Sequence, residues 1–215
     1  MRQSAAVKSL MLGLAMALWA AACVAIAAPE DDFRAGEKSY LAGDVVGAMP
    51  VLRRAADAGH AKAQALLGYI LDKAEFNEDA AKYFRLAADQ GNADGQYGLG
   101  TLFASGEGMA KDPVAARQWI ERAGAQGHAQ AINALAQAFL ASQLGFKADP
   151  ADTPGVDWVK KAADRGFLPA LDWLAKGWRA GSFGKVDLAQ AEKIEARMRE
   201  LRADARRQKG RTKAN

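Results

Sequence analysis

Few side chains in this chain are of types that perform chemistry. The 215 residues include two histidines and one cysteine. His60 and His128 each directly follow a glycine, and no acidic residue or second potential ligand recurs beside both. A structural zinc site takes about four ligands, whereas a polar residue at a helix start needs only the free amides of the first turn. We therefore interpret both histidines as helix-start residues and predict no metal site.

Sequence signatures of catalysis are not found either. The chain has no Gly-x-Ser-x-Gly turn, no Walker loop and no His-Glu-x-x-His motif. Gly106-Glu107-Gly108 is a loop glycine pair that lacks the lysine of a phosphate site. The aspartate and glutamate residues are scattered along the chain without a recurring cluster, as expected of a solvent-exposed surface. We predict a protein that is not an enzyme and that takes no cofactor.

The cysteine, Cys23, lies in a segment with the features of an export signal. Arg2 and Lys8 precede an uncharged stretch from Leu10 to Ile26, which ends in the small-x-small pattern Ala25-Ile26-Ala27. A basic start, an apolar stretch and a small-residue cleavage site are typical of a secretory signal peptide. We therefore expect a signal peptide over residues 1–27 and a periplasmic or secreted protein.

Two alternatives to cleavage after Ala27 stay open. The uncharged stretch of 17 residues is at the short limit of the ~17–25 that span a bilayer, so it could be an uncleaved anchor. Ala20-Ala21-Ala22-Cys23 resembles a bacterial lipobox, in which Cys23 would carry a lipid. Contact with a membrane is expected only through the signal or such a lipid. From Ala28 onward there is no cysteine, so disulfides and thiol chemistry are excluded there.

The composition favours a globular, helical protein. Half of the residues are hydrophobic, and alanine is the commonest residue, which argues against disorder and against an all-β fold. The formal net charge of +4 is too small to indicate nucleic-acid binding. The basic residues gather at the end, where residues 197–215 hold eight bases and two acids. Such a run could contact an anionic surface, although it is more often a frayed terminus.

The chain from residue 52 onward is a repeat. Four segments of 20 residues align without gaps, and their shared glycines are Gly59, Gly91, Gly127 and Gly166, separated by 32, 36 and 39 residues. Large apolar residues stand eight and seven positions before each glycine, and small pairs stand four and three before it. These spacings fall on one helix face, and the glycine suits the left-handed conformation that ends a helix.

A second helix follows each glycine. Apolar residues recur eight and twelve positions after it, as Leu67, Leu99, Leu135 and Leu174, then as Leu71, Phe103, Phe139 and Trp178. We expect these columns, and the aromatic column Tyr83, Trp119 and Trp158 of the first helices, to be core. Gly68 and Gly100 lie within second helices, where close packing is their expected use. Asp112-Pro113 has the pattern of a helix start.

These patterns predict an all-α fold, a right-handed α-α solenoid of about four to five helix pairs. The expected organisation is a solenoid over residues 28–185, a charged capping helix over 186–207 and a basic disordered tail over 208–215. A partial unit, residues 33–43, precedes the first full pair. A polar last helix fits because a solenoid must cover its end.

The string GEGMAKDPVAARQWIERAGAQGHAQAINALA resembles the Sel1-like repeat, and the resemblance covers roughly residues 40–178. The related tetratricopeptide repeat has a fixed period of about 34 residues and a different aromatic pattern. The resemblance implies an adaptor scaffold for proteins, including in bacterial envelope and exopolysaccharide assembly. Some secreted relatives carry a cysteine pair in each repeat, which this chain lacks. Penicillin-binding or β-lactamase-like behaviour of that branch is therefore not carried over.

A partner surface is expected on the second helices, on the side opposite the apolar residues that stand eight and twelve positions after each glycine. We call this row of apolar residues the apolar ridge. Side chains there differ between repeats while the apolar residues stay constant, as expected of a solvent-facing, concave surface of a solenoid. The predicted partner surface consists of Lys62, Tyr69, Asp94, Tyr97, Thr101, Gln130, Asn133, Gln137, Asp172 and Lys176. Plain solvation of these positions is the competing interpretation.

The sequence therefore predicts a non-catalytic, exported scaffold that binds another envelope protein. One alternative is a lipid-anchored component of a secretion or exopolysaccharide-export complex. Another is a small periplasmic hydrolase or peptidoglycan-binding protein, suggested only by the cysteine-rich relatives.

Overall fold

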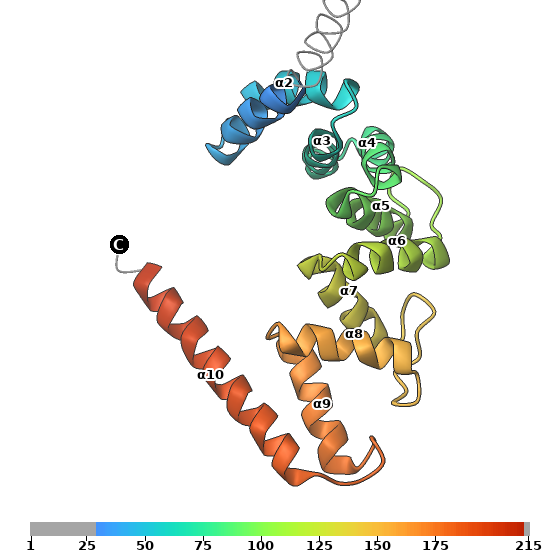
Figure 1. Cartoon of the computed structure of the whole chain (residues 1–215), viewed down its shortest axis with the longest axis vertical. Helices are drawn as coiled ribbons and strands as arrows, with labels where there is room; N and C mark the ends of the chain where they lie inside the picture. The colour runs from blue at the N-terminus through green and yellow to red at the C-terminus, as the bar shows by residue number, and fades with distance from the viewer. Residues whose placement is uncertain (1–28, 213–215) are drawn as a thin grey trace, which may run out of the picture. The chain divides into compact units, whose positions relative to one another are not determined.

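The computed structural model describes residues 29–212, and the regular secondary structure in that range is helical, with no β-strand (Figure 1). The predicted all-α class is confirmed. The chain divides into two compact units, with the division between Gly98 and Leu99. The predicted signal peptide over residues 1–27, Cys23 and the last residues, 213–215, lie outside the described residues.

The first unit begins with a helix over residues 29–41. It continues with α2 (Val45–Asp57), α3 (Ala61–Lys73), α4 (Asn77–Asp89) and the first part of α5 (Ala93–Ser105). Helix α2 packs on α3, and α3 packs on α4 (Figure 1). The unit is therefore a stack of neighbouring helices.

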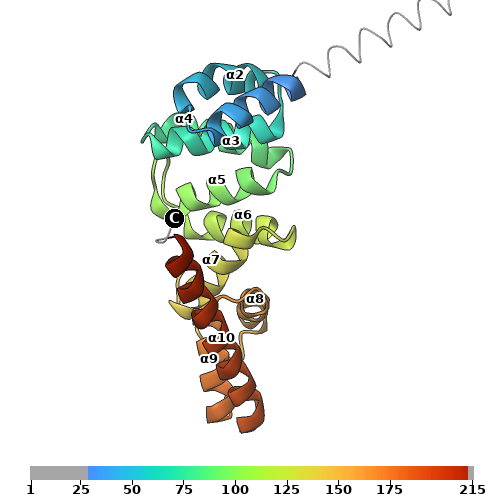
Figure 2. The ribbon, with the colours of Figure 1, turned by 90° about the vertical axis from the view of Figure 1, so that its left-hand side faces the viewer.

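The second unit holds the rest of α5 and five further helices. These are α6 (Pro113–Ala125), α7 (Ala129–Leu140), α8 (Thr153–Asp164), α9 (Leu168–Ala180) and α10 (Leu188–Thr212). Packing again runs from each helix from α6 to α10 to the next, and Figure 2 shows α10 beside α9. The four predicted helix pairs correspond to α2–α3, α4–α5, α6–α7 and α8–α9.

Each first helix ends at the glycine that the repeat predicts. Gly59, Gly91, Gly127 and Gly166 have φ angles of 89°, 83°, 84° and 85°, in the left-handed region that a residue with a Cβ enters at a cost. The predicted start at Asp112 is also confirmed, since its carboxylate accepts hydrogen bonds from the Val114 and Ala115 amides at 3.0 Å. Single glycines thus end the first helices, and a single aspartate caps the start of α6.

The ridges meet in a core of leucine, isoleucine, alanine and phenylalanine. Leu52, Leu67, Leu99 and Leu135 are fully buried. The prediction of close packing at Gly68 and Gly100 is confirmed. A Cβ on Gly68 would lie 2.9 Å from the Phe84 ring, and one on Gly100 would lie 2.6 Å from Ile120 Cγ1. These glycines leave room for a large side chain of the next repeat.

The prediction that both aromatic columns are core is only partly right. Tyr83, Trp158 and Phe139 are buried, but the prediction is wrong for Trp119, Phe103 and Trp178, which are half-buried. The Arg122 guanidinium covers part of the Trp119 ring, with its carbon 4.4 Å from the ring centroid. Spacing along a helix identifies the inward direction, but it does not tell whether a neighbour covers the end of a long side chain.

The last helix, α10, closes the second unit. Ala191 and Met198 are buried, and Glu195 pairs with Arg179 of α9 at 2.7 Å. The helix continues to Thr212, past the predicted boundary at residue 207 and into the range for which we expected a disordered tail.

Candidate functional site

The two histidines have the structural role that the sequence predicts. His60 Nδ1 accepts a hydrogen bond from the Ala63 amide at 3.1 Å, and His128 Nδ1 accepts one from the Ala131 amide at 3.1 Å. Each histidine is the N-cap of its helix, α3 or α7. An accepting Nδ1 assigns the ring proton to Nε2, and Nε2 of His60 faces the Glu30 carboxylate at 2.8 Å.

Neither a metal-binding cluster nor a membrane-spanning helix occurs within residues 29–212. Within residues 29–212, no group of three or more His, Asp or Glu side chains is arranged to hold a metal ion. None of the helices in that range combines the length and the apolar character that crossing a bilayer requires.

The predicted partner surface lies on the second helix of each pair. None of its ten residues is buried: Lys62, Tyr69, Asp94, Gln130, Gln137 and Lys176 are exposed, and Tyr97, Thr101, Asn133 and Asp172 are half-buried. The structure distributes them between the two units. The first unit holds Lys62, Tyr69, Asp94 and Tyr97, and the second holds the other six.

In the first unit, one exposed tyrosine ring lies beside a lysine that also acts on a second tyrosine. Tyr69 on α3 keeps 44% of its surface exposed, and it acts electrostatically on Tyr40, which lies in the helix over residues 29–41. The Lys73 ammonium lies 5.5 Å from the centre of the Tyr69 ring. Lys73 also influences Tyr97 of α5 electrostatically. We call Tyr40, Tyr69, Lys73 and Tyr97 the tyrosine cluster.

The hydroxyl groups of Tyr40 and Tyr97 stay protonated at neutral pH, because the pKa of each is raised. Burial is the main cause that raises the pKa of Tyr40, and the adjacent Tyr69 adds to the rise. Burial also raises the pKa of Tyr97, while the positive charge of Lys73 opposes that rise. Protonated phenols are hydrogen-bond donors as well as acceptors, so the cluster offers apolar rings and polar groups on one surface.

Sequence reasoning missed two members of the cluster, Tyr40 and Lys73. Lys73 stands four residues after Tyr69, which places both on one helix face, and this spacing was a usable signal. Tyr40 belongs to the partial unit before the first aligned repeat, where no column identifies its neighbours. Trp173, which belongs to none of the predicted columns, is packed against Phe139 with ring centroids 5.4 Å apart.

In the second unit, the predicted surface is polar rather than aromatic. Gln130 and Gln137 of α7 are exposed, and Asn133 between them has a buried side-chain oxygen for which the described structure shows no hydrogen-bond partner. On α9, Asp172 and Lys176 pair with each other at 2.7 Å. This surface is suited to hydrogen bonds with a polar chain.

A family model gives independent information on the repeats. The Sel1 repeat matches residues 61–92, 93–128 and 129–167. The three matches begin where α3, α5 and α7 begin, and each runs through the next helix, α4, α6 or α8. The family's repeat unit is therefore shifted by one helix relative to the pairs described above.

Similar solved structures come from two bacteria. A Sel1 repeat protein from Oxalobacter formigenes is 27% identical, with a TM-score of 0.67 over 80% of this chain and 68% of that one. A protective antigen of uropathogenic Escherichia coli that displays an SLR fold is 25% identical, with a TM-score of 0.70 over 80% of this chain and 38% of that one.

A curated relative from Rattus norvegicus, named DAP3-binding cell death enhancer 1, is 31% identical over 100 residues, which are 46% of this chain. The match covers only 20% of that relative's length, so the likeness concerns the repeats and not the whole protein. Repeat columns, helix pairs and solved relatives agree, and the chain is a Sel1-repeat protein with three consecutive repeats between residues 61 and 167.

Proposed function

We propose that this chain is a non-catalytic scaffold of the bacterial cell envelope that binds another protein through the exposed side of its second helices. The observation that carries the proposal is the tyrosine cluster. Tyr69 is 44% exposed, although its helix has an apolar ridge that buries Leu67 and Leu71. An aromatic ring left outside the core and supported by neighbours is typical of a protein contact.

The chemistry of the surface favours a protein partner. Tyrosine and amide side chains combine apolar area with hydrogen bonds, and aromatic residues contribute much of the binding energy at protein interfaces. One relative is named for binding DAP3, which supports protein recognition as a use of such repeats.

The envelope location is supported by the sequence of residues 1–27. Mass spectrometry of the mature N-terminus in the native organism tests it. A chain that begins at Ala28 supports a soluble exported protein, whereas a diacylated Cys23 would replace this with a lipid-anchored one. An unprocessed Met1 on a chain in the cytoplasm would overturn the envelope location.

Co-purification from the native envelope tests the binding surface. We expect Tyr69→Ala to reduce recovery of the partner at least about fivefold, because loss of a contact aromatic commonly costs more than 1 kcal/mol. Leu86→Ala is the matched control, since Leu86 is similarly exposed, at 41%, but lies on α4, a first helix. Equal recovery with both variants would contradict the proposed surface in the first unit.

The polar surface of the second unit needs its own variant. Gln137→Ala, combined with Gln130→Ala, removes two exposed amides from α7 without touching its buried ridge. Unchanged recovery with this double variant would confine the contact to the first unit. Hydrolysis of a chromogenic β-lactam by the pure protein, abolished by a point mutation, would overturn the non-catalytic proposal.

A further inference from the structure

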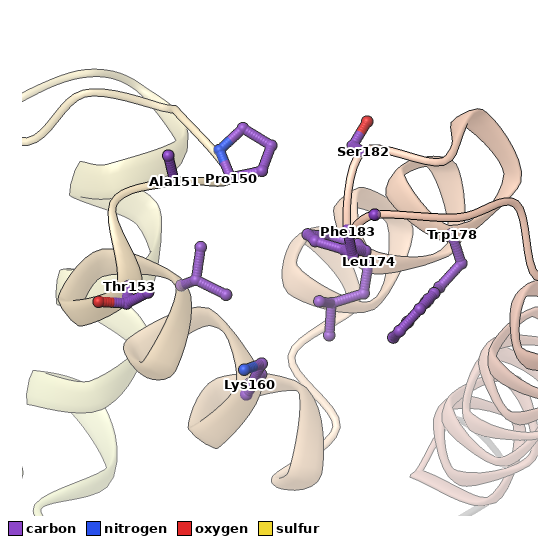
Figure 3. A pocket seen from close by; sticks show the side chains of 10 residues that line it. Pro150, Ala151, Thr153, Lys160, Leu174, Trp178, Ser182 and Phe183 are labelled. Atoms are coloured by element: carbon purple, nitrogen blue, oxygen red, sulfur yellow. The ribbon is translucent and has the colours of Figure 1, made fainter.

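The second unit contains a pocket of about 700 Å³ that shares no residue with the predicted partner surface. Its volume lies within the ~300–1,000 Å³ typical of sites for small ligands and anchoring side chains. Figure 3 shows Pro150 and Thr153 on one side, and Leu174, Trp178 and Phe183 on the other. One wall comes from α8 and the connection before it, and the other from α9 and the connection after it.

The first wall exists because one connection is longer than the others. Between α7 and α8 the chain takes the 12 residues 141–152, compared with 3 residues between α3 and α4. Ser142 and Leu144 in this connection have positive φ angles of 52° and 54°. A residue with a Cβ, such as leucine, adopts this conformation rarely and with strain.

The strained connection is held down by one aromatic residue. Phe146 is buried, and the carbon of the Arg117 guanidinium lies 3.6 Å from the centre of its ring. Its other neighbour is Phe139, with ring centroids 6.0 Å apart. These contacts anchor the connection four residues before Pro150, the first residue that lines the pocket.

The second wall is aromatic and equally well supported. Phe183 contacts Trp173 and Trp178 edge to face, with ring centroids 5.3 and 5.1 Å apart. Trp178 is the residue that the repeat predicted to be core and that the structure leaves half-buried. Its open side is part of this pocket.

The pocket has one charged lining residue, Lys160. Its ammonium lies 3.5 Å from the Asp157 carboxylate, and both side chains are about 60% exposed, so this pair is worth little. Asp149 and Asp152 do not line the pocket, and each accepts a backbone amide, from Ala151 at 2.8 Å and from Gly155 at 3.3 Å. Because the pair with Asp157 is exposed and weak, the Lys160 ammonium can exchange that partner for the carboxylate of a ligand.

We propose that this pocket binds a peptide segment of a partner protein in which an aromatic side chain stands next to a carboxylate. The aromatic wall of Trp178 and Phe183 receives the ring, and Lys160 pairs with the carboxylate. Charge complementarity selects this class, since the lining offers one cation and no anion. The inference does not depend on the proposed function, because the two surfaces have no residue in common.

The probes that test it are N-acetyl-L-tryptophan and its neutral amide, which differ only in the carboxylate. Ligand-observed NMR with the purified chain measures both affinities. We expect millimolar binding, with the carboxylate about two- to fivefold tighter than the amide, as for an exposed ion pair.

Variants of three residues locate the binding. Lys160→Gln is expected to abolish the preference for the carboxylate. Lys161→Gln, the control, is expected to retain it, because the Lys161 ammonium lies over the Trp158 ring at 4.1 Å and does not line the pocket. Ser182→Trp fills the mouth and should abolish binding of both probes, with circular dichroism confirming that the helices remain.

Three results would overturn the inference. These are no binding of either probe, equal binding of both probes to the unmodified chain, and binding that Lys160→Gln leaves unchanged. A preference for N-acetylglucosamine over N-acetyl-L-tryptophan would assign the aromatic wall to a saccharide and would overturn it as well.

Discussion

Single glycines in this protein act by the space that they leave for a neighbour. Gly68 faces the ring of Phe84, from the following helix, across a gap that a methyl group would close. In an exposed helix, replacing glycine by alanine stabilises the fold because the unfolded chain loses freedom. Within this packed contact the same change introduces a clash, so the sign of its effect reverses.

We expect Gly68→Ala to lower the free energy of unfolding by about 1–3 kcal/mol, the usual cost of overpacking. Gly210→Ala is the matched control. Gly210 lies in the helix α10, and nothing stands within 4 Å of the position of its missing Cβ. It should raise stability by up to about 1 kcal/mol. Denaturant unfolding measures both, and a gain with Gly68→Ala would refute the packing argument.

The histidine caps give a second prediction for single residues. His128→Ala removes the acceptor of the Ala131 amide and should cost about 0.5–2 kcal/mol. His128→Asn should keep most of the stability, because Asn92 caps α5 at the same repeat position, accepting from the Gly95 amide at 2.8 Å. Thermal unfolding compares the two. Equal losses would mean that the ring packs rather than caps.

Among the elements, the helix over residues 29–41 is attached to its neighbours by ion pairs. Asp32 pairs with Arg54 of α2 at 2.6 Å, and Glu30 contacts His60 at 2.8 Å. Phe33 stacks on the His60 ring, with centroids 4.7 Å apart. The hydrogen bond from His60, and then that from Arg34, holds the pKa of Glu30 below 4.5. The hydrogen bond from Arg54 holds the pKa of Asp32 below 3.8.

These two lowered pKa values predict how the docking of this helix depends on pH. A carboxyl group with a lowered folded-state pKa contributes stability that is present above its unfolded pKa and is lost as the pH falls through the folded value. We expect residues 29–41 to stay protected at pH 7 and to lose protection below the ordinary values of 4.5 and 3.8. Hydrogen exchange corrected for intrinsic rates measures this.

The double variant Glu30→Gln and Asp32→Asn is the control for that experiment. It should already show reduced protection at pH 7 and a smaller further change on acidification. A helix whose protection in the unmodified chain stays constant from pH 7 to below pH 3 would show that Phe33 and the apolar contacts hold it alone.

At the largest scale, packing within each unit of the described chain runs mainly between helices that follow one another. In such repeat architectures, stability is close to a sum of repeats and of the interfaces between neighbours. The division into two compact units falls within α5, at Gly98 and Leu99. Damage in one unit should therefore affect that unit first.

Hydrogen exchange of the Gly68→Ala variant tests this locality. We expect faster exchange over residues 29–98, with a smaller change over residues 99–212, because the clash with Phe84 lies within the first unit. An equal increase in both ranges would show that the chain opens as one cooperative body.

Features that recur in every repeat could be predicted from the sequence, because equivalent positions in successive repeats have similar surroundings. The glycine turns, the histidine caps and the ridge at Leu67 and Leu135 follow from columns. The pocket does not, since residues 141–152 occur once and their course depends on how Phe146 packs under Arg117. Exposure of Trp178 likewise depends on a neighbouring connection. The predicted partner surface is on the solvent side, but binding by it is still a prediction.

The fit between glycines and large side chains limits how this chain can be recombined. Phe84 needs Gly68 before it, Ile120 needs Gly100, and a Cβ at Gly124 would lie 3.0 Å from Trp158. Each fit joins one repeat to an adjacent one, so a repeat moved to another place meets the wrong partner. Shuffled or shortened arrays should fold only when both members of each such pair move together. The unit that must be kept intact in recombination is therefore the contact between two adjacent repeats, and not the single repeat.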